Sequence, residues 1–172
     1  YDTAASVMSS AIEQNPTMLN LRVSYASLLN TLNKPKEAEA QYNYVMKNIP
    51  ANPTVILLTS RALEKAGKPE LAIQVLEKGR DLVPNANYFT YDLSQLYLKT
   101  GQQEKMLAIA VDQLIADPSY YSLFTTSIQR SFQSDSEYDN LLKAVFNRAQ
   151  QYPDNSQLIE LMSWIYMQKR DF

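Results

Sequence analysis

The sequence predicts an all-α fold, a solenoid of tandem 34-residue helix-turn-helix repeats. Four prolines stand 34 residues apart: Pro16, Pro50, Pro84 and Pro118. Two further pairs keep the same interval: Pro35 with Pro69, and Gly67 with Gly101. A fixed period of this length indicates one supersecondary unit copied in tandem. Units of that kind build extended surfaces for holding other molecules rather than enclosed catalytic pockets.

Composition and charge narrow the function further. The chain has 172 residues, of which 45% are hydrophobic and 20% charged, as in ordinary ordered globular proteins. Its net charge is −2, so the chain lacks the excess of Lys and Arg that binding to nucleic acids or to anionic membrane surfaces requires. No apolar run approaches the ~20 residues that span a bilayer. We therefore expect neither a nucleic-acid partner nor direct membrane insertion.

Cysteine is absent and so is histidine. Their absence removes disulfides, zinc sites, thiol nucleophiles and imidazole bases from the available chemistry, and no cofactor is predicted. Zero cysteines fit an oxidising or a reducing compartment equally. A composition rich in Tyr, Asn, Gln and Ser leans towards a bacterial, extracytoplasmic protein, while the sequence itself leaves the compartment open.

Each repeat divides into two stretches with apolar residues at helical spacing. Residues 53–86 show this pattern well, because their first helix has one apolar face: Val55, Ile56, Leu58, Thr59, Ala62 and Leu63. Residues 66–68 form the turn, and Pro69 takes the first position of the second helix, where its missing amide hydrogen costs nothing. The second helix then ends before Pro84, whose ring interrupts the hydrogen-bond ladder.

Carried along the chain, this register predicts six segments. They are an orphan second helix at 1–16, repeats at 19–52, 53–86 and 87–120, a divergent repeat at 121–154 and an orphan first helix at 155–172. In the divergent repeat Ile128 replaces a small residue, and residues 134–137 carry one extra residue. This divergence reads either as a hinge or specialised contact surface, or as drift compensated by local packing. Neither end looks like the polar cap of a solenoid, so we expect a fragment of a longer array.

At these positions the chain resembles the tetratricopeptide repeat (TPR) family, whose pattern is Trp, Leu, Gly and Tyr, then Ala, Phe and Pro. The small residue of the first helix corresponds to Ala26, Ser60, Ser94 and Ser163. The alanine of the second helix corresponds to Ala4, Ala38 and Ala72. The family's Trp is absent, and its place is taken by Arg22, Ile56, Thr90, Phe124 and Ile159. The resemblance implies a right-handed α-α superhelix whose first helices line a concave groove.

Within that groove the register predicts three stripes of side chains. The first is Ser27, Arg61, Gln95, Gln129 and Trp164. The second is Thr31, Lys65, Lys99 and Gln133. The third is Val23, Leu57, Tyr91 and Thr125, with Tyr88 beside it. From these we take as the partner-binding groove Leu57, Arg61, Lys65, Tyr88, Tyr91, Gln95, Lys99, Gln129 and Trp164.

The residue types suggest a partner. Tyr and Arg are enriched where binding energy concentrates, and the three cations Arg61, Lys65 and Lys99 would favour an acidic, carboxylate-bearing segment. Each cation is equally readable as a solvated surface charge. Tyr88 and Tyr91 either line the groove or pack between helices, and Trp164 either faces the partner or is buried against a neighbouring helix.

The leading hypothesis is a non-catalytic scaffold that binds a peptide or partner protein along the groove. The alternative is a spacer or oligomerisation module, in which the face around Met162, Ile165 and Tyr166 packs head to tail on Val7 and Met8 of another copy. Catalysis is less favoured, because the acids available for paired-carboxylate chemistry sit among unrelated residues: Glu64, Asp92 and Glu160. An RNA-binding repeat would need a basic groove.

Overall fold

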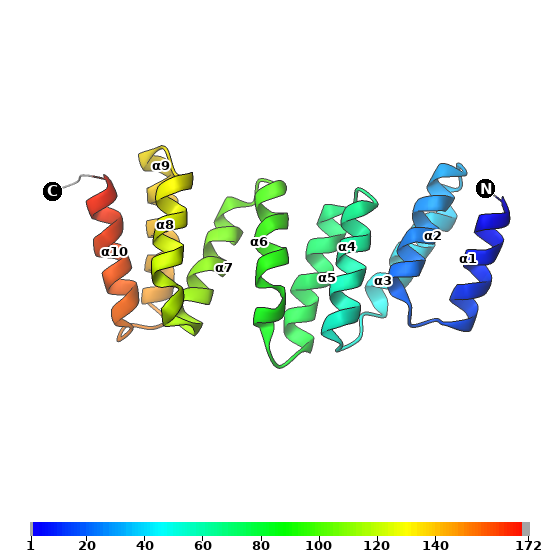
Figure 1. Cartoon of the computed structure of the whole chain (residues 1–172), viewed down its shortest axis with the longest axis horizontal. Coiled ribbons are helices and arrows are strands. Elements are labelled where there is room, and N and C mark those ends of the chain that lie inside the picture. Colours follow the sequence, from blue (N-terminus) through cyan, green and yellow to red (C-terminus); the bar gives the residue numbers. More distant parts are fainter. Residues whose placement is uncertain (1, 170–172) are drawn as a thin grey trace. The chain divides into compact units, whose positions relative to one another are not determined.

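A computed structural model describes residues 2–169, so the outermost residues of both predicted end segments, 1 and 170–172, lie outside it (Figure 1). The described residues form ten α-helices and two short 3₁₀ helices, without a strand, and the all-α prediction is confirmed. The first five α-helices are α1 (Asp2–Gln14), α2 (Leu19–Thr31), α3 (Pro35–Lys47), α4 (Pro53–Lys65) and α5 (Pro69–Leu82). The remainder are η1 (Ala86–Phe89), α6 (Thr90–Lys99), α7 (Gln103–Ala116), η2 (Pro118–Tyr120), α8 (Tyr121–Ser131), α9 (Asp135–Ala149) and α10 (Ser156–Lys169).

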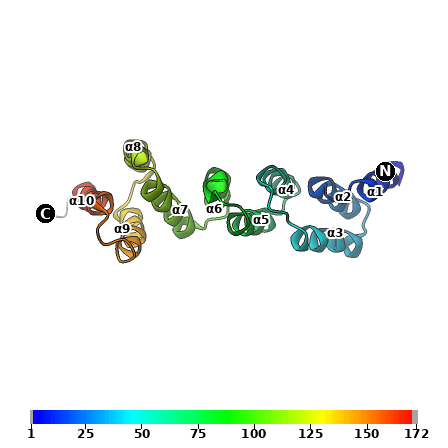
Figure 2. The same cartoon turned by 90° about the horizontal axis from the view of Figure 1, so that it is seen from below.

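The chain divides into two compact units, one up to Leu96 and one from Tyr97 onward, with the boundary inside α6. In the first unit α2 pairs with α3 and α4 pairs with α5, while α2 also contacts α1 and α4. Figure 2 shows α2 and α4 on one side of this unit and α3 and α5 on the other. These are the predicted first and second helices of two repeats.

Small residues allow the paired helices to approach closely. Ala26 and Ser60, at the position where the sequence predicts a small residue, are both buried. The Ser60 hydroxyl donates to the carbonyl oxygen of Ala72 over 3.4 Å, and so ties α4 to α5. Around them lie fully buried apolar side chains from all four helices: Val23, Leu29, Val45, Ile56, Leu63, Val75 and Leu76.

The turn between the helices of a repeat has the same geometry three times. Asn33, Gly67 and Gly101, each 34 residues apart, have φ values of 60°, 70° and 72°. In each turn an amide hydrogen bonds back to the carbonyl five residues earlier, as in Lys68 to Leu63 at 2.9 Å. This left-handed ending of a helix favours Gly and tolerates Asn. The 34-residue spacing of the glycines thus records a backbone requirement.

The family's Trp position is filled differently in the first repeat. Arg22, on α2, places its guanidinium carbon 3.7 Å from the centre of the Tyr44 ring on α3. Its Nη1 also donates to the side-chain oxygen of Gln41 over 2.9 Å. A planar cation stacked on an aromatic face can replace part of the contact that an indole would make.

The third first helix begins differently from the first two. The repeat predicted at 87–120 starts with the 3₁₀ helix η1, which precedes α6. The Asn52 side chain accepts from the amide of Val55, three residues on, and so caps α4. Asn85 instead accepts from the amide of Asn87, two residues on, and closes a tighter turn. A 3₁₀ residue advances the chain by ~120° rather than ~100°.

This difference in rotation about the helix axis adds up to ~80° over the four residues of η1, which is nearly the ~100° between successive residues of an α-helix. The burial pattern follows this rotation. On α4 Leu57 is half-buried and Leu58 exposed, whereas at the equivalent α6 positions Tyr91 is exposed and Asp92 half-buried. At this point of α6 the outward-facing residue is therefore displaced by one position from that which the repeat register predicts, whereas Gln95 stays exposed at the register position of Arg61.

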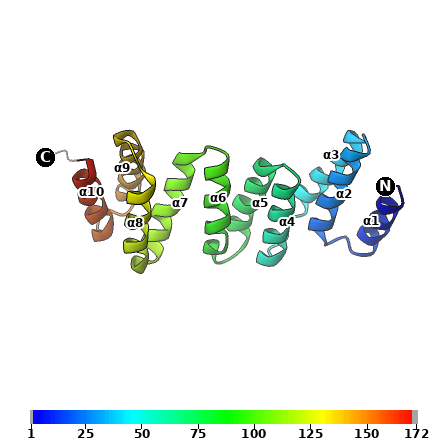
Figure 3. The same cartoon turned by 45° about the horizontal axis from the view of Figure 1, so that its top comes forward.

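In the second unit α7 contacts α9, and α9 pairs with α10 (Figure 3). The core is one cluster of buried side chains from α7 to α10: Leu107, Val111, Leu114, Phe124, Leu141, Val145, Leu158, Leu161 and Ile165. The expectation of an accessible face around Ile165 is wrong for that residue, because its side chain is fully buried. The exposed large apolar side chains of α10 are Ile159, Tyr166 and Met167.

The extra residue of the divergent repeat lies at a well-formed helix start. Ser134 and Glu137 make a capping box at the beginning of α9. The Glu137 carboxylate accepts from the amides of Gln133 and Ser134, at 2.8 and 3.0 Å. The ring of Phe132, which precedes α9, meets the ring of Tyr138 in its first turn edge to face, with centres 5.2 Å apart. Local capping and packing thus accommodate the insertion.

Candidate functional site

Helical spacing places Leu58 and two predicted groove residues of α4, Arg61 and Lys65, on one face. Leu58, Arg61 and Lys65 recur at intervals of three and four, so their side chains lie on the same side of the helix. All three are exposed, and Leu58 retains 48% of its accessible surface. The sequence pattern had assigned Leu58 to the apolar face that is buried, and that assignment is wrong. Leu57, which the pattern assigned to the groove, is half-buried beside it.

An ion pair joins this face to α6. The Nε atom of Arg61 donates to Oδ1 of Asp92 over 3.1 Å. The Asp92 side chain is mostly buried and that of Arg61 mostly exposed. Because the rotation of α6 turns Asp92 toward α4, the partner of Arg61 could not be found from the repeat register. Arg61 is consequently a compensated cation, which weakens its part in the predicted preference for acidic partners.

Two tyrosines stand out on the same surface of the first unit. Tyr88 on η1 is 56% exposed and Tyr91 on α6 is 73% exposed. The alternative that they pack between helices is therefore wrong. The centre of the Tyr88 ring lies 6.5 Å from the centre of the buried Phe89 ring. Gln95, one turn beyond Tyr91, is exposed as well. Aromatic rings this accessible supply apolar contact area beside a polar group that can still hydrogen-bond.

We call these residues the first-helix surface, which comprises Leu57, Leu58, Arg61, Lys65, Tyr88, Tyr91, Asp92 and Gln95. The surface does not extend to α2 in the predicted way. Val23, the α2 counterpart of Leu57, is fully buried, and Ser27, the counterpart of Arg61, is half-buried. The first-helix surface is thus confined to α4, η1 and the beginning of α6.

The remaining predicted groove residues belong to the second unit. Lys99 is exposed at the end of α6. Gln129 on α8 donates through Nε2 to the side-chain oxygen of Gln168 on α10, over 3.0 Å. Trp164 is half-buried, and its ring centre lies 6.3 Å from that of Tyr138 on α9. Gln129 and Trp164 therefore contact neighbouring helices of the second unit. Thr125, from the third predicted stripe, is buried.

The acidic side chains bear on metal binding and paired-carboxylate chemistry. Among residues 2–169 no three acidic side chains gather closely enough to hold a metal ion. Of the three acids considered for hydrolytic chemistry, Asp92 is engaged by Arg61. In the same part of the chain no helix is long and apolar enough to cross a membrane.

Helix pairs recurring every 34 residues, three of them with the same left-handed turn, define a tetratricopeptide-like repeat fold, as the sequence resemblance implied. No protein-family model matches the sequence, and no curated protein shows a significant match to it. Among solved structures, the MamA RS-1 ArsTM double mutant aligns with 90% of this chain and 86% of its own, with 18% identity and a TM-score of 0.42. YrrB, described as a TPR protein with an unusual peptide-binding site, aligns with 97% and 86%, with 18% identity and a TM-score of 0.39.

Proposed function

We propose that this chain is a non-catalytic interaction scaffold that holds a peptide or partner protein on its first-helix surface. The observation that carries the proposal is the exposure of Tyr88 and Tyr91 beside the Arg61–Asp92 ion pair. Tyrosine supplies a large contact area at a small cost in side-chain entropy, because only two of its torsions need to be fixed. Such residues, flanked by polar groups, recur at the centres of protein interfaces.

The composition of the surface suggests how a partner is held. Leu58 and the two tyrosine rings provide apolar area, for which the partner must supply matching apolar side chains. Lys65, exposed on α4, offers a charge-assisted hydrogen bond to a carboxylate of the partner. The Arg61–Asp92 pair holds both its side chains in place before binding. We therefore expect apolar anchors to dominate affinity and one acidic group to orient the bound segment.

Affinity capture from a lysate of the source cells tests this proposal. The triple variant Leu58→Ala, Tyr88→Ala, Tyr91→Ala removes apolar area from the surface without altering the ion pair. A matched control, Phe146→Ala with Tyr152→Ala, removes two exposed aromatic rings from elsewhere in the chain. Proteins retained by the wild type and the control, but lost by the triple variant, would identify partners of the first-helix surface. Circular dichroism establishes that all three proteins remain helical.

A partner retained equally by the triple variant would contradict the proposal. In that case the partner binds somewhere other than α4, η1 and the beginning of α6. Capture that changes with Lys65→Ala alone, and not with the triple variant, would likewise show that charge rather than apolar area governs binding.

Self-association of the chain is a second candidate function. Val7 on α1 is 64% exposed, and Ile159, Tyr166 and Met167 are exposed on α10. Ile159 takes the register position at which Ile56 and Phe124 are buried, so this face of α10 matches what a second helix normally covers. Sedimentation velocity at rising concentration tests the idea. Association that Val7→Glu and Tyr166→Glu both abolish would support it, and a monomer at all concentrations would refute it.

A further inference from the structure

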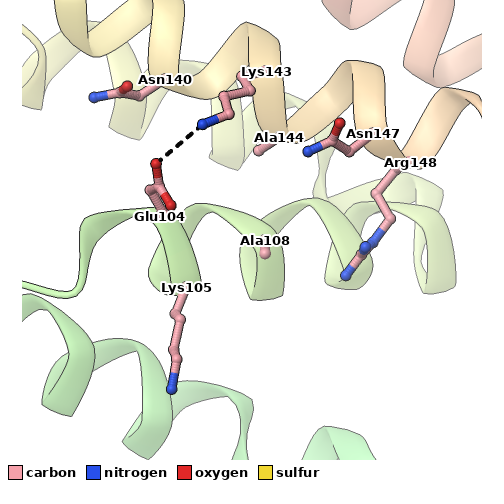
Figure 4. Close-up of a pocket in the computed structure, with 8 residues that line it drawn as sticks. All are labelled: Glu104, Lys105, Ala108, Asn140, Lys143, Ala144, Asn147 and Arg148. Atoms are coloured by element: carbon pink, nitrogen blue, oxygen red, sulfur yellow. Dashed lines mark hydrogen bonds and ion pairs between the residues drawn. The ribbon is translucent and has the colours of Figure 1, made fainter.

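A hollow of about 260 Å³ lies between α7 and α9 in the second unit, on helices that the sequence pattern did not connect with binding. Figure 4 shows Ala108 on α7 and Ala144 on α9 at its centre. Both side chains end at Cβ, so neither can fill the space between the helices. The volume is slightly below the range for drug-sized ligands and suits one side chain with a short stretch of backbone.

Two ion pairs cross from α9 to α7 beside the hollow. Lys143 Nζ lies 3.3 Å from the Glu104 carboxylate, as drawn in Figure 4. The Arg148 guanidinium makes two hydrogen bonds to the Asp112 carboxylate, the one from Nη2 measuring 2.9 Å. The hydrogen bonds that Arg148 donates to the Asp112 carboxylate raise the pKa of Arg148, against the opposing effect of burial, so the guanidinium stays charged. Lys105 extends away from α9, with its ammonium 5.4 Å from the Tyr97 ring centre.

The two pairs differ in strength. Lys143 and Glu104 are 67% and 77% exposed, and an ion pair so accessible contributes only ~0–1 kcal/mol. An incoming carboxylate can therefore replace Glu104, which then turns into solvent. Not every N–H group of these two cations is used by the ion pairs. An ammonium carries three N–H groups and a guanidinium five, and the two acids engage only some of them.

Two side-chain amides line the hollow without a hydrogen-bond partner among residues 2–169, those of Asn140 and Asn147. They are seven residues apart on α9, which places them ~10.5 Å apart along the helix axis. Three residues of an extended peptide span ~10 Å. Each amide can thus pair with one peptide group of the same extended segment, since a carboxamide both donates and accepts.

We propose that the hollow between α7 and α9 binds an extended acidic peptide segment. The segment's backbone pairs with Asn140 and Asn147, and a Glu or Asp carboxylate takes the place of Glu104 on Lys143. This site lies entirely in the second unit and shares no residue with the first-helix surface. Either proposal can therefore fail without the other.

Two pools of capped heptapeptides test this site, one with Glu fixed at the central position and one with Gln there. Each pool is titrated into the whole chain while the backbone amide signals of Ala108 and Ala144 are followed by NMR. We expect saturable shifts with the Glu pool and binding about tenfold weaker with the Gln pool, which corresponds to ~1.4 kcal/mol. Acetate serves as the probe for a simple anion site.

Four variants sharpen the test. Lys143→Ala should remove the preference for the Glu pool, and Glu104→Gln should strengthen binding severalfold because the competing carboxylate is gone. Ala144→Leu should block both pools by filling the hollow while leaving every charge in place. Lys36→Ala, an exposed lysine on α3, is the matched control and should change nothing. The dispersion of the same spectra reports whether each variant is folded.

Three results would overturn the proposal. The first is the absence of saturable shifts at Ala108 and Ala144 with the Glu pool. The second is equal binding of both pools, or binding that survives Ala144→Leu. The third is an acetate titration that reproduces the same shifts at the same concentrations, which would define a small-anion site rather than a peptide site.

Discussion

At the scale of single residues, Gly79 marks the tightest packing in the first unit. It lies within α5, and a Cβ atom built on it would stand 2.8 Å from Cγ2 of Ile56 and 3.1 Å from the Phe89 ring. Both neighbours are fully buried. The absence of a side chain here allows α5 to pack against α4 and η1 together.

We therefore expect Gly79→Ala to destabilise the chain, although alanine is the better helix former. The gain in helix propensity is ~1 kcal/mol, whereas overpacking a full core costs ~1–3 kcal/mol, so the net loss should be about 1 kcal/mol. Urea denaturation followed by circular dichroism measures the difference. A variant more stable than the wild type would show that Ile56 and Phe89 can move aside at little cost.

Arg22 shows how one residue departs from the family pattern without losing its structural role. A double-mutant cycle with Arg22→Met and Tyr44→Leu should give a coupling energy of ~0.5–2 kcal/mol, the range for a partly desolvated cation–π pair. Tyr44→Phe should leave this coupling intact because the ring face remains. Additive effects of the two substitutions would mean that the guanidinium contributes only through Gln41.

At the scale of helices, the start of α9 gives a pH-dependent contribution to stability. Hydrogen bonds from the Gln133 amide, and from Ser134, lower the pKa of Glu137 below its usual value. The carboxylate therefore stabilises the folded chain fully above its unfolded pKa of ~4.3, and this contribution is lost as pH falls through the lower folded value.

Comparing Glu137→Gln with the wild type isolates this effect. The variant should unfold at a lower temperature at pH 7, and the difference should shrink as the pH falls below ~4 because the wild-type carboxyl becomes neutral too. Thermal melts across this pH range provide the measurement. A difference that stays constant with pH would mean that the cap works through geometry and not through charge.

Helices were predictable because their signals are local. Pro35 and Pro69 begin α3 and α5 as expected, and the glycine spacing corresponds to left-handed turns. The phase of α6 was not predictable, because Asn85 can close either a tight turn or a regular helix cap with the same side chain. The Arg61–Asp92 pair depends on the rotation of α6. The hollow depends on the side chains of Ala108 and Ala144, which are too short to fill the space between α7 and α9.

At the scale of the whole molecule, the chain consists of two units that each have their own buried core. Residues in a repeat array contact mainly their neighbours, so local stability can differ along the chain. Leu63 lies in the core of the first unit and Leu141 in that of the second, and both are fully buried. Truncating either to alanine should cost ~2–5 kcal/mol within its own unit.

Hydrogen exchange read by mass spectrometry tests this expectation. Leu63→Ala should lower protection most strongly in α2 to α5, and Leu141→Ala most strongly in α7 to α10. Equal loss of protection along the whole chain for both variants would show instead that the two units unfold as one cooperative system.

The short 3₁₀ helix η1 has a consequence for how such a chain can evolve. It decides whether Tyr91 or Asp92 is displayed, although it contains neither residue. A substitution at Asn85 that restored an ordinary helix start would turn the Tyr91 ring inward and the Asp92 carboxylate outward. Neither Tyr91 nor Asp92 would itself be changed. A substitution in the linker before η1 can thus change the surface chemistry of this repeat, although none of the surface residues is itself substituted.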